Sequence, residues 1–465
     1  MLRTILAVLA VVVPLTACVK DDPCAFGECA GPSAPNPDGG DTDGGEVGPP
    51  PGCDPNADAK DAPACVADSY ALFVDKNGSS ENPGTRAAPL PSIGLAVRRH
   101  GNRPRIYVCE GTFPESVPVS DAVSIFGGFA CMSWTYNGKK AVVAAKGDTR
   151  PALNVTNVAK PIVIADLAIA GASESSSSAA VFVGNTTDVT FRRIEMTGAD
   201  VTVAAGNGVN ATAVTTTTSS DGNSGMPGAA KTCMCAAGGV SVGGAGGDPP
   251  TAGQPALGGG QAGEGADCAG IGKGKDGSDA ARGADAPKST DLGTLDASGW
   301  LARPGAPGVS GSPGQGGGGG SANGGSGGCG GCGAIGGGGG TGGGGSIALA
   351  SFRSGVRLVD CVLKAGRAGQ GGDGGKGAAG GEGGAGGGPG AGAGCVGGKG
   401  GRGSESGAGA GGAGGVSAAI LYKGTKPSVE GTTSTTSGAA GALGKGGAAT
   451  NDGLPGRAEP IIEAP

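Results

Sequence analysis

The chain has 465 residues, of which 107 are glycine, and aromatic residues make up 3% of it. Although two or three domains would fit this length, much of it cannot build an ordinary packed core. The net charge of −6 excludes the strongly basic surface of a nucleic-acid-binding protein, so we expect no nucleic-acid partner. The single histidine, His100, argues against histidine-based catalytic triads and histidine-ligated metals.

Residues 1–18 have the features of an export signal. Arg3 precedes an apolar run, 5–15, that is too short to span a bilayer. The run ends in Leu15-Thr16-Ala17-Cys18, which resembles the lipobox of bacterial lipoproteins. The resemblance implies cleavage before Cys18, acylation of its thiol and a lasting membrane anchor at the outer membrane or cell surface. An ordinary secretory signal is the alternative.

Residues 19–66 are rich in Pro, Gly and Asp, and they are predicted to form a tether. So few apolar residues cannot offset the entropy cost of ordering the segment. In an exported protein, cysteines close in sequence favour small disulfide loops, although the sequence does not fix their connectivity. The candidates are Cys24 with Cys29 and Cys53 with Cys65.

From Leu72 the pattern changes to short apolar runs separated by turn residues. The stretches 73–97, 106–116 and 123–129 resemble the N-terminal cap and first coils of pectin-lyase-like parallel β-helix proteins. More narrowly, they are similar to an uncharacterised bacterial β-helix family that opens with an NPGT-type turn, here 82–85. The resemblance implies an all-β, right-handed parallel β-helix. It leaves the activity open, because the family mixes lyases, hydrolases, adhesins and unassigned surface proteins.

The residues themselves favour the same architecture. Ile106 and Val108 would point to one side of a strand and Tyr107 to the other. The amphipathic segment 93–99 would cover the open end, where an exposed strand edge would promote aggregation. Residues 162–171 align with 189–198, and the pattern returns at 356–366; such repeats are the signature of a solenoid.

Glycine-rich insertions interrupt these coils. We predict a cap and first coils at 67–200, a glycine-rich insertion at 201–345, a coil at 346–365, a Gly-Gly-X insertion at 366–415, and a last coil with a tail at 416–465. The Gly-Gly-X repeat resembles glycine-rich regions of mycobacterial surface proteins. Its period fits extended helices of three residues per turn that hydrogen-bond side by side. Disorder is the alternative, because ordering this segment costs roughly 50–100 kcal/mol.

Three charged residues, Asp166, Arg193 and Asp360, occupy equivalent positions in the repeats. In lyases of the resembled superfamily, Asp clusters bind calcium and a nearby Arg or Lys removes a proton from the sugar. The alternative is a ladder of alternating charge on a solvated sheet face. We favour the ladder and assign no catalytic residue, because no dense group of paired carboxylates surrounds Arg193.

The remaining cysteines suggest further disulfides. Cys233 and Cys235, and Cys329 and Cys332, have the spacing of zinc ligands, but export and the lack of nearby histidine favour disulfides; we expect no metal and no cofactor. We also predict a Cys109–Cys131 bond. Residues one coil apart stack at about 4.8 Å, within the Cα separations that a disulfide accepts. The alternative is a buried free thiol at Cys109.

Two functions follow from these patterns. We favour a non-catalytic, lipid-anchored surface protein, structural or adhesin-like, whose partners are the membrane and extracellular polysaccharide or cell-envelope components. The alternative is a polysaccharide lyase or glycoside hydrolase of the pectin-lyase-like superfamily. A cluster of acidic and basic side chains on consecutive coils would favour the enzyme, and we do not find one in the sequence.

Overall fold

The computed structural model describes residues 47–145, 151–172, 176–215, 220–225, 227–248, 252–256, 259–264, 267–389 and 394–465. The predicted signal peptide with Cys18, and the candidate pair Cys24 and Cys29, lie outside these residues. Within the described ranges, no helix is long and apolar enough to cross a membrane.

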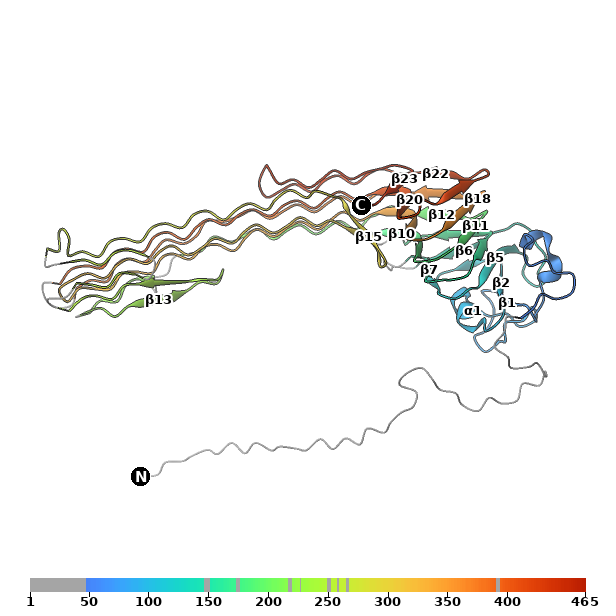
Figure 1. Cartoon of the computed structure of the whole chain (residues 1–465), viewed down its shortest axis with the longest axis horizontal. Helices are drawn as coiled ribbons and strands as arrows, with labels where there is room; N and C mark the ends of the chain where they lie inside the picture. The colour runs from blue at the N-terminus through green and yellow to red at the C-terminus, as the bar shows by residue number, and fades with distance from the viewer. Residues whose placement is uncertain are drawn as a thin grey trace, which may run out of the picture. The chain divides into compact units, whose positions relative to one another are not determined.

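Three open, parallel sheets hold most of the strands (Figure 1). Sheet A contains β1 (Ala71–Val74), β2 (Arg105–Cys109), β5 (Ser124–Phe129), β8 (Ile162–Ala165), β11 (Val189–Arg192), β18 (Val356–Val359) and β21 (Ser428–Glu430). Sheet B contains β3 (Thr112–Phe113), β6 (Ala141–Ala144), β9 (Leu167–Ala170), β12 (Glu195–Gly198), β19 (Val362–Ala365) and β22 (Ser434–Thr436). Sheet C contains β4 (Val117–Val119), β7 (Leu153–Thr156), β10 (Ser178–Gly184), β17 (Ser346–Phe352), β20 (Ser417–Lys423) and β23 (Ile461–Glu463). The fold is therefore all-β with parallel sheets.

From β2 onward the chain visits the sheets repeatedly in the order A, B, C. Each strand pairs with the strand that next occupies the same sheet, so Val189 lies opposite both Ile162 and Val356. The alignment of repeats inferred from the sequence is thereby confirmed. Residues in register form buried inner rows; the row of sheet A holds Leu72, Ile106, Ile125, Ile164, Phe191 and Leu358. Each such side chain contributes about 1.5–3 kcal/mol by its burial.

A short helix, α1 (Ile93–Arg99), packs against the first strands of sheets A and C, as expected from its amphipathic sequence. The hydroxyl of Ser92 accepts from the N–H of Leu95 and caps the helix. The carboxylate of Glu115 accepts from the first two helical N–H groups. His100 follows the helix, and its Nδ1 lies 3.2 Å from the carbonyl oxygen of Arg103.

Three glycine-rich arms leave the sheets at the same place. Arm 1 (199–345) connects β12 to β17, arm 2 (366–416) connects β19 to β20, and arm 3 (437–460) connects β22 to β23. Each arm therefore leaves from sheet B and returns to sheet C. Figure 1 shows arms 1 and 2 side by side over most of their length, with the shorter arm 3 beside them near the sheets. Arm 3 lies within the segment that we predicted as the last coil and tail.

The described parts of the arms are ordered by hydrogen bonds at every third residue. The N–H groups of Gly372 and Gly375 donate to the carbonyl oxygens of Thr341 and Gly338, at 2.8 and 2.7 Å. This spacing agrees with extended helices of three residues per turn, the ordered one of our two interpretations. Hydrogen bonding offsets the entropy cost that made disorder the alternative.

Two antiparallel hairpins are inserted in arm 1. The first is formed by β13 (Lys231–Met234) and β14 (Val240–Gly243), and the second by β15 (Gly293–Asp296) and β16 (Gly299–Ala302). Neither was predicted from the sequence, because their apolar residues are few and lie among glycines.

Candidate functional site

The charged column of Asp166, Arg193 and Asp360 lies at the end of three strands of sheet A. The preceding residues are paired in register across the sheet: Arg192 lies opposite both Ala165 and Val359. All three have positive φ angles between 53° and 58°, which turn the chain from sheet A toward sheet B. Their equivalence, inferred from the repeats, is confirmed.

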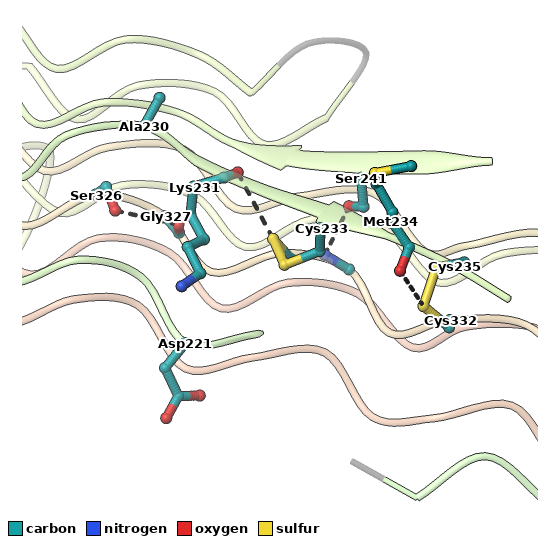
Figure 2. Close-up of a disulfide and its surroundings, with 12 residues drawn as sticks. Asp221, Ala230, Lys231, Cys233, Met234, Cys235, Ser241, Ser326, Gly327 and Cys332 are labelled. Carbon is teal, nitrogen blue, oxygen red and sulfur yellow. Dashed lines mark hydrogen bonds between the residues drawn. A yellow bond between two sulfur atoms is a disulfide. The ribbon is translucent and has the colours of Figure 1, made fainter. Parts of the chain in front are cut away.

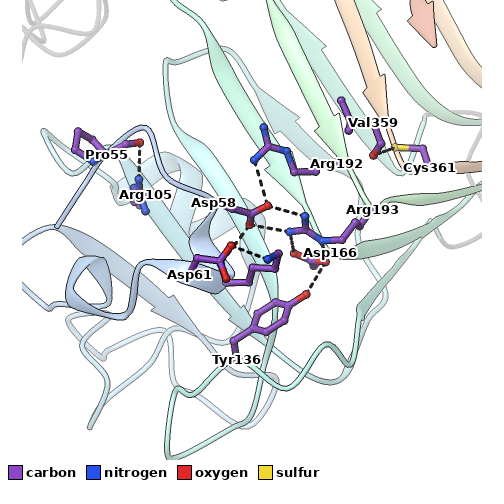
Figure 3. A network of polar contacts seen from close by, with 11 residues as sticks. Pro55, Asp58, Asp61, Arg105, Tyr136, Asp166, Arg192, Arg193, Val359 and Cys361 are labelled. Carbon is purple, nitrogen blue, oxygen red and sulfur yellow. Dashed lines mark hydrogen bonds and ion pairs between the residues drawn. The ribbon is translucent and has the colours of Figure 1, made fainter. Parts of the chain in front are cut away.

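Arg193 is held between two carboxylates (Figure 3). Its Nε and Nη2 donate to the two oxygens of Asp166 at 2.8 and 2.7 Å. Its Nη1 and Nη2 donate to the oxygens of Asp58 at 2.6 and 2.8 Å. Arg192 donates to Asp58 at 3.2 Å, and the hydroxyl of Tyr136 donates to Asp166 at 3.1 Å. The side chain of Asp166 is only 3% exposed, so this pairing compensates charges where little water reaches them.

The network changes the pKa of its members. Burial alone would raise the pKa of Asp58, but the hydrogen bonds from Arg193 and from the backbone N–H of Lys60 lower that pKa to about 2. Burial alone would lower the pKa of Arg193, but its bonds to Asp166 and Asp58 outweigh this and raise it above its ordinary value. Arg193 therefore stays protonated, which does not suit a general base.

The network attaches residues 47–66 to the outer face of sheet A. Asp58 caps the short helix η1 (Ala59–Asp61), which is followed by η2 (Pro63–Cys65), and a disulfide joins Cys53 to Cys65. We expected these residues to belong to the tether 19–66. Residues 47–66 are ordered because the ion pairs of Asp58 and the Cys53–Cys65 disulfide fix their position, although their composition alone favours disorder. No local pattern around Asp58 points to its partners.

Asp360 does not join the pairing of Asp166 with Arg193. Its Oδ1 accepts from the N–H and the hydroxyl of Thr432, at 2.9 and 3.0 Å. Both oxygens of Asp166 accept from Arg193, so they do not form the open carboxylate cluster that calcium requires. The pairing of Asp166 with Arg193 agrees with the charge ladder that we favoured, but the ladder does not extend to Asp360. The segment of Asp58 also covers this face, which we expected to be solvated.

A groove of about 420 Å³ lies beside this network on sheet A. Its charged members are Asp58, Arg105 and Arg192, and Ser124 and Thr190 add hydroxyl groups. Arg105 donates to the carbonyl oxygen of Pro55 at 2.7 Å and to the hydroxyl of Tyr107 at 3.1 Å. The guanidinium of Arg105 is thus already hydrogen-bonded within the protein. The groove therefore provides polar groups for binding rather than groups suited to acid–base catalysis.

We expect Asp58→Asn to weaken the attachment of residues 47–66 by about 2 kcal/mol at neutral pH. The pKa of Asp58 is about 2 in the fold, against an ordinary value of 3.8. A lowered carboxyl pKa stabilises the fold above the ordinary value, and this contribution is lost as the pH falls through about 2. Hydrogen exchange of 59–66 should therefore show a loss of protection between about pH 4 and pH 2 in the parent and not in the variant.

The control for this prediction is Asp61→Asn. The side chain of Asp61 is 63% exposed and pairs with Lys60, outside the network. This variant should keep the parent's pH profile. If Asp58→Asn also kept it, the network would not be what holds the segment.

Five disulfides join described cysteines. Cys109 is bonded to Cys131 with a Cα separation of 5.0 Å, close to the one-coil stacking distance from which we predicted the pair. Cys53 is bonded to Cys65, as expected for a small disulfide loop in the N-terminal segment. Cys268 is bonded to Cys395, which the sequence did not suggest. Asp75 lies near Cys109 and Cys131, but these sulfurs bond to each other and do not fit a metal.

The zinc-like cysteine pairs cross-link two segments of arm 1 (Figure 2). Cys233 is bonded to Cys329, and Cys235 to Cys332. Residues i and i+2 share one face of a strand, and residues i and i+3 share one face of a helix with three residues per turn. The C-x-C at the end of β13, whose second cysteine directly follows the strand, therefore faces the C-x-x-C of the glycine segment. All four sulfurs are used, so none remains as a thiolate ligand for zinc. Cys361 is buried and has no disulfide.

The chain matches no known family model, no curated protein and no solved structure. Its function is therefore inferred from its own residues and their geometry.

Proposed function

We propose that this chain is a non-catalytic, lipid-anchored protein of the outer membrane or cell surface that binds extracellular polysaccharide or cell-envelope components. In this proposal the three sheets are the faces of a right-handed parallel β-helix, and the glycine arms project from one corner of it. The order A, B, C and the pairing of each strand with the next strand in its sheet support this architecture.

The observation that carries the non-catalytic part is the pairing of Arg193 with both Asp166 and Asp58. A lyase of the superfamily resembled by the sequence would need an Arg or Lys that can take a proton from the sugar. Arg193 is instead held protonated by two carboxylates, one of which comes from the packed N-terminal segment. The charged column therefore attaches residues 47–66 to sheet A.

Export is supported by the five disulfides in the described part of the chain, because disulfides persist in oxidising compartments. Three of them tie segments of the glycine arms that are 96 to 127 residues apart. Outside the cell a glycine-rich chain is exposed to proteases, and these disulfides would restrict the opening of the chain that cleavage requires.

We expect Cys18→Ala to abolish membrane anchoring, because it removes the thiol that would carry the lipid. The variant should remain unprocessed or appear in the soluble fraction. Mass spectrometry of the parent's membrane fraction should identify an acylated N-terminal Cys18. The control is Cys24→Ala, which should stay anchored. A Cys18→Ala protein that is still cleaved and membrane-bound would show that the anchor lies elsewhere.

A glycan array combined with a lyase and hydrolase assay on the same purified chain tests the function. We expect saccharide binding without formation of unsaturated or shortened products. Product formation that is lost on Arg193→Lys but retained in Arg282→Lys would favour the enzyme instead. Arg282 is a suitable control because it makes its ion pairs with Asp285 and Glu405, away from the charged column.

The enzymatic alternative is favoured by one observation, the groove beside the charged column with its arginines and hydroxyl groups. A polysaccharide lyase or glycoside hydrolase would bind its substrate in such a groove. If the groove binds a chain without cleaving it, the same residues serve the binding protein that we propose.

A further inference from the structure

The hairpin formed by β15 and β16 lies on the outer face of sheet C, where arm 1 returns to the sheets. Leu295 and Trp300 are directly opposite each other in the hairpin, so both point to the same side. Leu295 is fully buried in an apolar cluster with residues of sheet C, whereas Trp300 is only partly buried at its margin. A salt bridge between Arg303 and Asp291, at 2.8 Å, closes the base of the hairpin.

Trp300 stands between two cavities. One has a volume of about 460 Å³ and is bounded on its far side by the start of arm 1, 203–206. The other has a volume of about 270 Å³ and reaches the outer face of sheet C at Phe182. Ser176, Ser177 and Leu301 line both cavities together with Trp300. The two cavities thus adjoin at Trp300, and we refer to them together as the trough.

The trough combines apolar surface with hydrogen-bonding groups. Leu301 and Val203 are 54% and 46% exposed, although both are apolar. Hydroxyl groups of Ser176 and Thr341 lie on its walls. The Nε1 of Trp300 is buried without a hydrogen-bond acceptor among the described residues. This N–H lies beside Gly345 and is closed off from solvent, so it does not face a ligand in the trough.

None of the described residues that line the two cavities is charged. This distinguishes the trough from the groove on sheet A, which contains Asp58 and two arginines. A charged ligand would lose hydration in the trough without gaining a counter-charge. The chemistry therefore selects a neutral ligand that has an apolar face for the indole and hydroxyl groups that can hydrogen-bond to the hydroxyls on the walls.

We propose that this trough binds a neutral saccharide unit by stacking the sugar ring against Trp300. The C–H face of a pyranose meets the apolar indole and Leu301, while its hydroxyl groups meet the hydroxyls of Ser176 and Thr341. The inference rests on the proposed binding function and names its ligand class.

The test is tryptophan fluorescence of the full chain, purified in a zwitterionic detergent without a sugar head group. The probes are neutral hexasaccharides of glucose, mannose, galactose or xylose, with an oligomer of galacturonate as the charged comparison. We expect a neutral probe to shift the emission at millimolar concentration or below. The chain has two tryptophans, and Trp134 is buried with its Nε1 donating to the carbonyl oxygen of Arg86. Trp134→Phe should keep the response and Trp300→Phe should remove it.

Binding itself is measured by calorimetry on two further variants. Trp300→Ala should weaken affinity at least about tenfold, as expected for a central aromatic contact. Leu301→Glu should do the same by placing a charge in both cavities, and its exposed position should leave folding intact. Val309→Glu is the matched control, because Val309 is equally exposed at 54% and lines neither cavity.

The outcomes separate this inference from the proposed function. Neutral saccharide binding that is unchanged in both Trp300→Ala and Leu301→Glu overturns the trough and leaves the binding function standing. Binding of the galacturonate oligomer alone has the same consequence. If no saccharide binds the parent chain, the inference and the polysaccharide-binding function both fail.

Discussion

Removing both disulfides that link β13 to the facing glycine segment is expected to destabilise that part of the arms by about 6 kcal/mol. Cys233–Cys329 and Cys235–Cys332 close loops of 96 and 97 residues. In the chain-entropy model, the first bond across such a loop contributes between about 4 and 5 kcal/mol. The second then closes a loop of only about five residues and adds about 2 kcal/mol.

Because either bond alone closes the large loop, the effects of removing the two disulfides are non-additive. Changing Cys233 and Cys329 to Ala, or Cys235 and Cys332 to Ala, should cost only about 2 kcal/mol, because the remaining bond still closes the large loop. Changing all four should cost more than the sum of the two. Amide hydrogen exchange measures this directly, and the quadruple variant should exchange up to about 10⁴-fold faster around Gly327.

The control is removal of Cys53–Cys65, which closes a 12-residue separation in the segment packed on sheet A. Exchange in the arms should not change in this variant. Equal and additive effects of the two single removals would contradict the view that both bonds restrict one large loop.

Gly327→Ala is expected to destabilise the arms by about 3 kcal/mol. A Cβ at this position would overlap the carbonyl oxygen of Gly317 in the neighbouring segment. Backbone atoms cannot rotate away as a side chain does, so the two segments must separate. The hydrogen bonds from Gly317 to Gly328 and from Gly327 to Gly244, both near 2.9 Å, would be strained with them. Calorimetric unfolding and hydrogen exchange measure the loss.

Gly206→Ala is the matched control within the same arm. The nearest atoms to a Cβ at Gly206 belong to the side chain of Thr341 at 3.6 Å, an ordinary contact, and no positive φ is required there. Alanine also restricts the unfolded chain more than glycine does, so this variant should be unchanged or stabilised by up to about 1 kcal/mol. If both alanines were tolerated equally, close packing of backbones would not explain the glycine content of the arms.

Several features of this protein are determined locally, and the sequence alone predicts them. Short apolar runs with alternating side chains specify strands such as β2, because each inward residue must be buried. The repeat of 162–171 at 189–198 and at 356–366 predicts which strands stack. The one-coil spacing of Cys109 and Cys131 predicts their approach. The amphipathic segment 93–99 predicts a covering helix for a similar reason.

Whether the glycine arms are ordered depends on the tertiary structure. All three arms leave from sheet B and return to sheet C, so strand stacking brings them side by side before they bond to one another. The register continues from sheet to arm: Ser346 pairs with Ser417 in sheet C, and Gly343 then donates to Ala413 and Gly340 to Ala410. A glycine segment by itself has no core and favours disorder. When such a segment lies in register beside other segments, its backbone N–H and C=O groups form hydrogen bonds with theirs.

The partners of single polar groups were also decided by the tertiary structure. Asp58 lies 135 residues from Arg193 in the chain, within a segment whose composition indicates a tether, yet both belong to one buried ion network. Trp300 reaches its trough because an unpredicted hairpin packs on sheet C. The pattern of apolar residues along the chain specifies the strands and their spacing, because buried positions recur at regular intervals in the sequence. Contacts between distant segments depend on which face each segment presents after the sheets have formed, and no short stretch of sequence contains that information.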